Sequence, residues 1–478
     1  MNDPKGLPDV PLVVDLDGTL LRIDLLHESA LTLLRSDPLS VLRLPGWLAG
    51  GKAHLKREIA RRVSLDFSGM PYHEELVEWL RSERARGRRL VLATASDEKL
   101  AEGVAAHLPI FDEVLASDGE TNNASHRKAA ALVERYGERG FDYVGNSNAD
   151  MAVWERSRRA VLVSAPPKIR RAAAQRVQVD REFGAAPAGI RAWVKALRLH
   201  QWMKNLLLFL PLLGSHQIFD AGLLAAVFIA FIAFGLCASS VYVVNDLMDL
   251  ESDRHHPRKR LRPFAAGVLS PLTGVAMAGL LLVSSFTIAA LVAPAFLAWL
   301  GVYFVITVAY TFGLKRKEIV DAISLAGLYT LRIIAGGAAV GLPASFWLLA
   351  FSLFLFLSLA FVKRYSELQL MLTQGRDDAR GRGYRTSDLP VIEMMGVVSG
   401  FAAVMVLALY INSESVLRLY QQPEFIWLTV PIFLYWITRV WIKTHRGLMH
   451  DDPVLFAIKD RVGITLGVLF LAVMWAAT

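Results

Sequence analysis

The chain has 478 residues, which gives room for two or three domains. Hydrophobic residues make up 54% of it, a larger fraction than soluble globular proteins carry. A net charge of +8 would also suit a nucleic-acid-binding protein, but the basic residues lie between long apolar runs. Composition therefore predicts a protein that is partly embedded in a bilayer and has no nucleic-acid partner. The single cysteine excludes an intramolecular disulfide.

Residues 1–165 are expected to form an α/β domain with a parallel sheet. Short apolar runs, which are typical of buried strands, alternate there with helical patterns. The runs are Val10–Leu16, Arg89–Ala95, Glu113–Ser117, Tyr143–Gly145 and Ala160–Ser164. The first run leads into the sequence Asp-Leu-Asp-Gly-Thr at positions 15–19, which places two carboxylates at the carboxyl end of a strand.

This Asp-Leu-Asp-Gly-Thr sequence resembles the first motif of the haloacid dehalogenase (HAD) superfamily. Thr94, after a strand, resembles the second motif, Lys128 at a helix start the third, and Gly145–Asp150 the fourth. The resemblance implies a Rossmann-like phosphatase domain with a small helical cap at about residues 22–85. In such phosphatases one aspartate attacks phosphorus and another transfers a proton.

The resemblance also implies a role for each matching residue. Asp15 would be the nucleophile, Asp17 the general acid and base, and Thr94 and Lys128 would hold phosphate oxygens. One Mg²⁺ would be bound by the set Asp15, Asp17, Asn146 and Asp150. Asn146 stands where the family often has aspartate, so a domain that binds phosphorylated ligands without catalysis is the alternative.

Residues 166–190 are predicted to be a linker, because a Pro-Pro pair and a basic run precede the sequence Gly-Ala-Ala-Pro-Ala-Gly. The membrane domain would occupy residues 191–478. At its start, Ile190–Lys204 carries basic residues at helical spacing with apolar residues between them. This pattern predicts an amphipathic helix that lies on an anionic leaflet.

A densely charged stretch, Asn245–Gly267, follows an apolar run that is long enough to cross a bilayer. Asp246, Asp249 and Asp253 are spaced i, i+3 and i+7, which on a helix puts three carboxylates on one face. Such a cluster needs a cation, and oxygen ligands without Cys or His favour Mg²⁺ with substrate phosphates as its other ligands. The basic residues that follow suit the same anions, although a run that only sets membrane topology would explain this basic half alone.

The pattern Asn245-Asp246-x-x-Asp249-x-x-x-Asp253 resembles the first aspartate-rich motif of the UbiA superfamily of intramembrane prenyltransferases. Its continuation to Gly267 resembles the decaprenyl-phosphate phosphoribosyltransferase branch of that superfamily. The resemblance implies an all-α membrane bundle, one or more Mg²⁺ held by the three aspartates, phosphoribosyl pyrophosphate (PRPP) as donor and a polyprenyl phosphate as acceptor.

Apolar runs predict nine spans. They are residues 203–218, 221–244, 271–291, 294–313, 319–341, 345–363, 390–411, 425–442 and 461–478. Lys and Arg concentrate in the loops after every second span, which predicts that the amino terminus and both sites face the cytoplasm. We expect a multi-pass protein of a bacterial-type inner (plasma) membrane.

Further polar residues beside these spans are expected to bind substrate. They are Lys204, Asn245, Arg254, Lys259, Arg260, Arg262, Tyr310, Lys315, Arg316, Arg332, Lys363, Arg364 and Tyr365. Arg332 lies within a span, where its alternative is a packing arginine satisfied by helix carbonyls. Aromatic prenyltransferases of the superfamily commonly have a second Asp-x-x-x-Asp motif at the position of Lys363–Tyr365. This chain lacks that motif, and in this respect it resembles the phosphoribosyl branch. Asp451-Asp452-Pro453 resembles that branch too.

Together the two resemblances imply a bifunctional membrane enzyme. The transferase half would move 5-phosphoribose from PRPP to a decaprenyl-type polyprenyl phosphate and release pyrophosphate. The HAD half would then remove the 5-phosphate, giving polyprenyl-phosphoryl ribose for cell-envelope glycans such as arabinogalactan. The alternative is a prenyltransferase that uses a prenyl diphosphate and an aromatic or other acceptor, with the HAD domain acting as a pyrophosphatase or a binding module.

The charge alternation makes a topology prediction. A reporter fused after Gly214 should be periplasmic and one fused after Gly375 cytoplasmic, because Lys and Arg are retained on the inner side. Alkaline phosphatase and fluorescent-protein fusions measure both positions. The reverse pattern would contradict the predicted placement of both sites.

Overall fold

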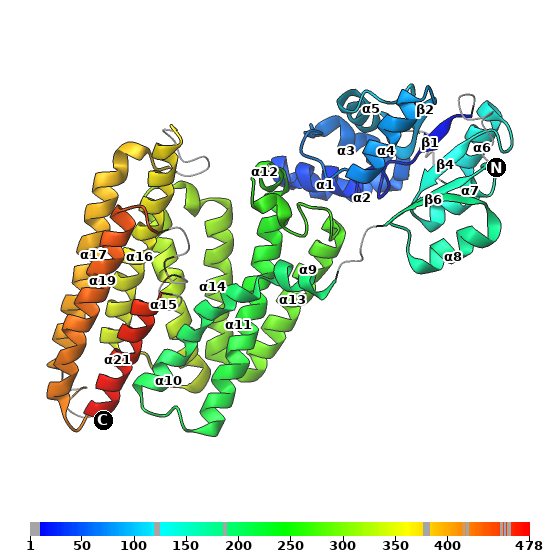
Figure 1. The fold of residues 1–478 in the computed structure, drawn as a ribbon. Helices are drawn as coiled ribbons and strands as arrows, with labels where there is room; N and C mark the ends of the chain where they lie inside the picture. Colours follow the sequence, from blue (N-terminus) through cyan, green and yellow to red (C-terminus); the bar gives the residue numbers. More distant parts are fainter. Residues whose placement is uncertain are drawn as a thin grey trace. The chain divides into compact units, whose positions relative to one another are not determined.

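The structure, a computed structural model, describes residues 10–118, 125–184, 189–375, 383–413, 416, 420–449, 453, 456 and 460–478 (Figure 1). The chain divides into two compact units. The first contains Met1–Leu197 together with Tyr242–Ala278, and the second contains Arg198–Val241 together with Gly279–Thr478. Residues from the predicted HAD domain and from the aspartate-rich stretch therefore share one unit.

A six-stranded parallel sheet forms the centre of the amino-terminal part, in the order β3-β2-β1-β4-β5-β6. In register, Val14 of the central strand lies between Leu92 and Val144. The strands are β1 (Leu12–Val14), β2 (Leu90–Asp97), β3 (Glu113–Ser117), β4 (Asp142–Gly145), β5 (Ala160–Val163) and β6 (Val179–Phe183). The parallel sheet that the sequence predicts is confirmed.

Helices connect these strands as parallel pairing requires. Between β1 and β2 the chain forms four α-helices and a 3₁₀ turn, the region in which the sequence predicts a cap. Asp24 caps the first of these helices by accepting the backbone N–H of Leu26. The helices are α1 (Leu25–Ser36), η1 (Pro38–Arg43), α2 (Leu44–Ala49), α3 (Lys52–Arg62), α4 (Glu74–Ala85), α5 (Glu98–His107), α6 (His126–Tyr136), η2 (Asn148–Asp150), α7 (Met151–Trp154) and α8 (Pro167–Arg176).

The segment predicted as a linker, residues 166–190, is largely folded instead. It contains helix α8 and strand β6, whose Phe183 is buried in the core of the sheet. β6 carries three exposed residues in succession, so its sequence lacks the apolar run by which the other strands were recognised. Only Gly184–Gly189 separates β6 from α9 (Ile190–Leu197).

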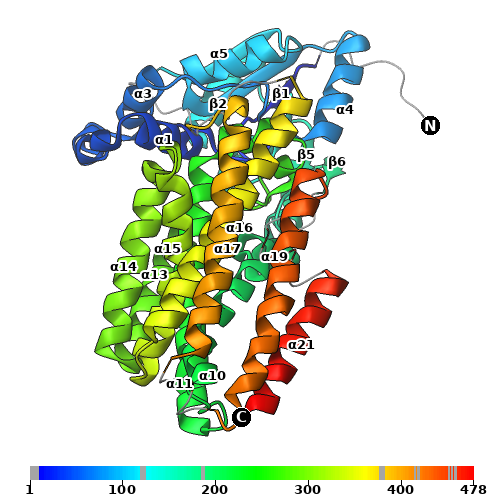
Figure 2. The same ribbon diagram turned by 90° about the vertical axis from the view of Figure 1, so that its left-hand side faces the viewer.

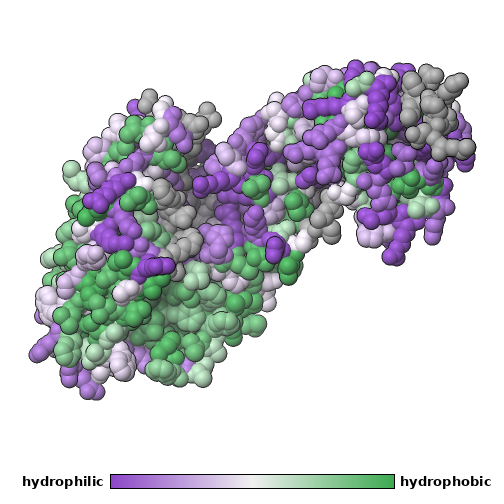
Figure 3. Space-filling model, in the orientation of Figure 1, coloured by the Kyte–Doolittle hydropathy of each residue, from purple (hydrophilic) through white to green (hydrophobic). Residues whose placement is uncertain are grey.

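Seven helices among the described residues are long and apolar enough to cross a membrane. In Figure 3, hydrophobic residues form a broad band over these helices, with hydrophilic residues above it and at the lower tips, as expected where the middle of the helices faces lipid. The seven cover α11 (Ala221–Met248), α13 (Pro271–Val292), α14 (Pro294–Phe312), α15 (Val320–Val340), α16 (Phe346–Thr373), α17 (Leu389–Ile411, preceded by η6, Thr386–Asp388) and α19 (Thr429–His445, preceded by η7, Pro423–Leu428), and Figure 2 shows them as long, roughly aligned helices. The chain is thus a multi-pass membrane protein.

The predicted count of nine spans is not confirmed. The last predicted span is α21 (Arg461–Ala477), which is shorter than the other seven. The first is a 3₁₀ run, η3 (Leu199–Phe209), that continues into the short helix α10 (Leu210–Gly214). Because a 3₁₀ helix rises about 2.0 Å per residue and an α-helix about 1.5 Å, this run extends roughly 30 Å.

Candidate active sites

The predicted HAD residues meet at one edge of the parallel sheet. Asp15 and Asp17 follow β1, Thr94 lies in β2, and Asp150 ends the turn η2 after β4. Since β2, β1 and β4 are neighbours and parallel, their carboxyl ends lie at the same edge. Lys128 reaches this edge from α6.

Asp15 is held by a cation and a hydroxyl. Lys128 Nζ donates to its Oδ1 at 2.7 Å, and Thr19 Oγ1 donates to its Oδ2 at 3.1 Å. Burial raises the pKa of Asp15 to about 7, while the positive charge of Lys128 opposes the rise. The positive charge of Lys128 thus favours the ionised form of Asp15, which is the form that a nucleophilic carboxylate requires.

Asp17 accepts three hydrogen bonds from neighbouring groups. Its Oδ1 accepts the backbone N–H of Leu25 at 2.8 Å, and its Oδ2 accepts the hydroxyls of Ser96 at 2.6 Å and Thr94 at 3.2 Å. Burial raises the pKa of Asp17 above its ordinary value. A raised pKa suits a carboxyl group that must carry a proton to a leaving group.

The fourth motif is fixed by Asp150. Its Oδ1 accepts the hydroxyl of Tyr143 at 2.8 Å, and its Oδ2 accepts the backbone N–H groups of Asn146 and Ser147. The Asn146 amide in turn packs against Gly18, where an added Cβ would lie 2.2 Å from Asn146 Nδ2. Gly18 has a φ of +75°, so both its backbone and its surroundings require glycine.

The donor set at this edge suits a hard cation. Asp15 and Asp150 supply two carboxylates, and the backbone carbonyl of Asp17 would supply a third oxygen. The described residues include no group of three or more His, Cys, Asp or Glu side chains that could hold a metal. The Mg²⁺ site stays a prediction.

Two polar groups at this site, Ser96 and Tyr143, were not predicted from the sequence, and a third, Lys56, comes from the basic cap. Ser96 lies two positions beyond Thr94. The Tyr143 hydroxyl accepts a hydrogen bond from Lys128 Nζ at 2.9 Å and donates one to Asp150. Lys56, from α3, donates to the Ala95 carbonyl at 2.6 Å. Burial lowers the pKa of Lys56, and the negative charges of Asp17 and Asp24 oppose the shift. The cap thus brings a cation to the catalytic edge.

The aspartate-rich stretch, called the aspartate-rich turn below, joins the end of one helix to the start of the next. Helix α11 ends at Met248, Asp249 has non-helical backbone angles (φ −101°, ψ 11°), and α12 (Leu250–His255) follows. The side chains of Asp246 and Asp253 are nearly inaccessible, at 3% and 2% exposed. The backbone N–H groups of Asp249 and Asp253 still donate to the carbonyls of Asn245 and Asp249, as in an α-helix, so the distortion is confined to one residue. The shared face of the three aspartates stays a prediction.

Arg262 joins the two buried aspartates. Its Nη1 donates to Asp246 Oδ1 at 3.0 Å and to Asp253 Oδ2 at 2.5 Å. Among the described groups, Asp253 Oδ1 and Asn245 Oδ1 are buried and accept no hydrogen bond. Both are oxygens of the kind that Mg²⁺ prefers. Lys259 Nζ lies 4.0 Å from Asp253 Oδ1, and the Mg²⁺ site of this stretch stays a prediction.

The other basic residues of this stretch differ in exposure. Lys259 and Arg260 are exposed on the turn η4 (Lys259–Leu261), where anions can reach them. Arg254 is buried, and its guanidinium contacts Glu28 and the Ala265 carbonyl. The predicted contact of Arg254 with substrate stays a prediction, but its donors already have protein partners.

In the second unit, Arg332 is buried among protein groups. Its guanidinium donates to Asn205 Oδ1 at 3.1 Å, to the Leu328 carbonyl at 2.6 Å and to the Tyr303 hydroxyl at 3.1 Å. It also lies 5.4 Å from the ring centroid of Tyr329. The carbonyl contact matches the packing alternative, and a substrate contact of Arg332 stays a prediction.

Arg364 belongs to a second buried cluster. Its Nε lies 2.6 Å from Asp321 Oδ2, a second ion pair joins it to Glu367, and Tyr310 donates to Asp321 Oδ1 at 2.7 Å. The side chains of Asp321 and Arg364 are 0% and 1% exposed. The cluster thus unites two predicted residues, Tyr310 and Arg364, with an acid that sequence reasoning missed.

The remaining predicted residues of the second unit lie in several places. Lys204 Nζ lies 5.7 Å from the ring centroid of Tyr329, and Tyr365 contacts His445. Lys315 and Arg316 form the turn η5 (Leu314–Arg316), and Lys363 is half-buried in α16. Asp451 and Asp452 lie outside the described residues.

Comparison with protein families assigns both parts of the chain. The UbiA prenyltransferase family matches residues 206–476, which is more than half of the chain, and the haloacid dehalogenase-like hydrolases match residues 12–155. The chain belongs to the UbiA prenyltransferase family. This family member carries a HAD-like domain at its amino end, as the motifs predict.

Three relatives of this UbiA family member differ in how much of it they share. Protein y4nM of Sinorhizobium fredii is 36% identical over 465 residues, which cover 96% of this chain and 89% of y4nM. Nodulation protein NoeC of Azorhizobium caulinodans is 37% identical over 296 residues, 60% of this chain and 95% of NoeC. Decaprenyl-phosphate phosphoribosyltransferase of Mycolicibacterium smegmatis is 35% identical over 294 residues, 60% of this chain and 90% of that enzyme.

Lys56 gives a prediction about the HAD-like domain. Lys56→Ala should raise the KM for a phosphate ester with a second anionic group by about tenfold, because the hydrogen bond from the ammonium group to that second anion is lost. The kcat should change little, since Lys56 lies outside the Asp15–Asp17 pair. Steady-state phosphate release measures both constants. Lys52→Ala, which removes an exposed cation from the same helix, is the control, and an equal effect there would contradict a specific role.

Proposed function

We propose that the chain transfers 5-phosphoribose from PRPP to a polyprenyl phosphate and then removes the 5-phosphate with its HAD-like domain. The observation that carries the proposal is the aspartate-rich turn, where buried carboxylate and amide oxygens lie beside Arg262 and exposed Lys259 and Arg260. Such a turn suits a pyrophosphate bound through Mg²⁺ and basic side chains. A relative that is 35% identical is a decaprenyl-phosphate phosphoribosyltransferase.

The prenyl-diphosphate alternative has less support. Aromatic prenyl transfer would need a second acidic motif for a second diphosphate-bound ion. In the second unit, Asp321 is a buried acid, but Arg364 and Tyr310 already contact both of its oxygens. Consumption of a prenyl diphosphate in place of PRPP would favour the alternative.

In the proposed transfer, Asp246, Asp249, Asp253 and Asn245 would hold the metal, and Lys259, Arg260 and Arg262 would contact the phosphates. Mg²⁺, when bound, offsets charge on the departing pyrophosphate. An oxygen of the lipid phosphate attacks the anomeric carbon as the bond to pyrophosphate breaks, and inversion is expected. The turn then serves to orient the donor and to stabilise the leaving group.

In the proposed second step, Asp15 attacks the 5-phosphate and forms an aspartyl-phosphate. Asp17, whose pKa is raised by burial, protonates the departing ribose oxygen and later accepts a proton from water. Lys128 balances the charge of the phosphate beside Asp15. The products are lipid-linked ribose and inorganic phosphate.

A short connection supports action on one lipid. The chain between β6 and α9, Gly184–Gly189, can extend at most about 20 Å. The product of transfer therefore stays at high effective concentration for a phosphatase on the same membrane face. We also propose that both sites face the cytoplasm from an inner membrane, and that the lipid-linked pentose is used for a cell-envelope glycan.

The transfer step predicts that Asp249→Asn lowers PRPP-dependent lipid labelling by about 100-fold or more, because a metal ligand is lost. Phosphatase activity on a soluble ester should stay within about twofold, which serves as the folding control. Radiolabelled PRPP and lipid extraction measure the transfer. Wild-type labelling in this variant would contradict the assignment of the turn.

The phosphatase step predicts that Asp15→Asn accumulates lipid-linked phosphoribose, because the nucleophile is lost while transfer continues. Wild type should yield lipid-linked ribose. Mass spectrometry of the extracted lipids separates the two. If both proteins yield only the phosphorylated lipid, the HAD-like domain acts on another substrate, of which released pyrophosphate is the nearest candidate.

A further inference from the structure

Helix α1 of the HAD-like domain contacts the aspartate-rich turn through a buried ion pair within the first unit. Arg254 Nη1 and Nη2 donate to the two carboxylate oxygens of Glu28 at 2.8 and 2.9 Å. Both side chains are 5% exposed. Burying an unpaired carboxylate or guanidinium costs free energy, so each of the two side chains holds the other in place.

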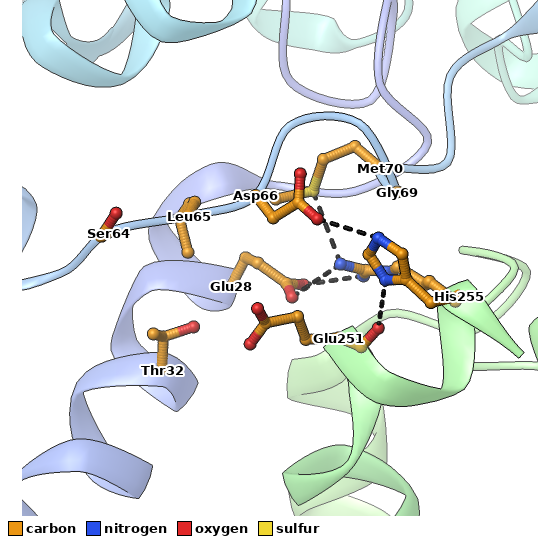
Figure 4. Close-up of a pocket in the computed structure, with 10 residues that line it drawn as sticks. Glu28, Thr32, Ser64, Leu65, Asp66, Gly69, Met70, Glu251 and His255 are labelled. Atoms are coloured by element: carbon orange, nitrogen blue, oxygen red, sulfur yellow. Dashed lines mark hydrogen bonds and ion pairs between the residues drawn. The ribbon is translucent and has the colours of Figure 1, made fainter. Parts of the chain in front are cut away.

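Further close contacts join the HAD-like domain to the aspartate-rich turn. His255 Nε2 lies 2.9 Å from Asp66 Oδ2, and Figure 4 shows His255 facing the loop that carries Asp66 and Gly69. A Cβ on Gly69 would lie 2.8 Å from the His255 ring, and a Cβ on Gly267 would lie 2.9 Å from Arg22 Cβ. The cavity left between the two sides measures about 10 Å³, which is room for about one water and for no substrate.

The two ends of this contact reach both candidate sites. On one side, the backbone N–H of Leu25 at the start of α1 donates to Asp17, one turn before Glu28. On the other side, Arg254 directly follows Asp253, the aspartate that Arg262 holds. Leu31 of α1 adds an apolar contact with the cluster of Leu247, Leu250 and Phe264 around the turn.

We propose that Glu28 of the HAD-like domain is a positioning residue of the transferase, which holds Arg254 and so the orientation of Asp253 in the aspartate-rich turn. The inference rests on the proposed function for its catalytic consequence. NoeC and the M. smegmatis enzyme match only about 60% of this chain, so the dependence would be a property of the fused architecture.

The test compares Glu28→Gln with Arg35→Gln in the full-length protein in lipid nanodiscs. Arg35 belongs to the same face of α1 but pairs with Glu251 in the open, at 3.5 Å and with 49% and 59% of the two side chains exposed. Hydrogen–deuterium exchange of residues 250–256 reports the order of the turn without any activity. We expect exchange there to rise in Glu28→Gln and to match wild type in Arg35→Gln.

Activity then separates positioning from general damage. In Glu28→Gln, transfer should fall about tenfold and the Mg²⁺ concentration for half-maximal transfer should rise, because Asp253 loses its orientation. Hydrolysis of p-nitrophenyl phosphate by the HAD-like domain should stay within about twofold. Unchanged exchange in the turn would overturn the proposal. An increase in transfer would overturn it too, since Glu28 would then compete with a substrate phosphate for Arg254.

Two controls keep the outcomes apart. Labelling of lipid by PRPP in the wild-type protein tests the proposed function alone. If the wild-type protein labels no lipid, hydrogen–deuterium exchange still tests the contact between Glu28 and Arg254. If Glu28→Gln does not fold, Glu28→Asp takes its place, because it keeps the charge and shortens the side chain by one methylene. The proposal requires raised exchange in the turn and a higher Mg²⁺ requirement in that variant, and wild-type values for both would overturn it.

Discussion

Carboxylates that share a site repel one another, and one protein cation holds each pair of carboxylates together in this chain. In the HAD-like domain, Lys128 contacts Asp15 directly and Asp150 through the Tyr143 hydroxyl. In the aspartate-rich turn, Arg262 contacts Asp246 and Asp253. Each arrangement holds two carboxylates close together around one positive charge, and a divalent cation and a phosphate would bind to such an arrangement.

The same cost of burying charge explains why several basic residues contact protein groups. Arg332 and Arg364 lie in membrane-spanning helices, where an unpaired guanidinium is expensive. Each is satisfied by carbonyl, hydroxyl, amide or carboxylate oxygens of its own unit. Arg254 is buried in the first unit and is paired by Glu28. Lys259 and Arg260, in contrast, are exposed, so anions can reach them.

Local sequence predicted those parts of the fold that local chemistry determines. Five strands follow from short apolar runs, and Asp15, Asp17, Thr94, Lys128 and Asp150 meet because parallel strands end at one edge. Strand β6 escaped prediction because an edge strand with exposed Asp, Arg and Glu has no apolar run. The first predicted span differs from expectation because η3 is a 3₁₀ helix, and a run of apolar residues does not distinguish a 3₁₀ helix from an α-helix.

Long-range pairs lie beyond such reasoning. Glu28 and Arg254 are 226 positions apart, and no spacing rule connects them. Ser96 could have been found, since it lies two residues from Thr94 on the same strand and so on the same side of it. The local distortion at Asp249 could not be predicted, because i, i+3, i+7 spacing fits a regular helix equally well.

We propose that both halves act in turn on one sugar, and the fate of each phosphate of PRPP distinguishes this order of reactions from the alternatives. Wild-type protein would be given polyprenyl phosphate and PRPP labelled separately in the pyrophosphate, in the 5-phosphate and in the ribose carbons. The account predicts that the first label leaves as pyrophosphate, the second leaves later as inorganic phosphate, and the ribose label remains on the lipid. Retention of the 5-phosphate label on the lipid, or failure of ribose to reach the lipid, would contradict it.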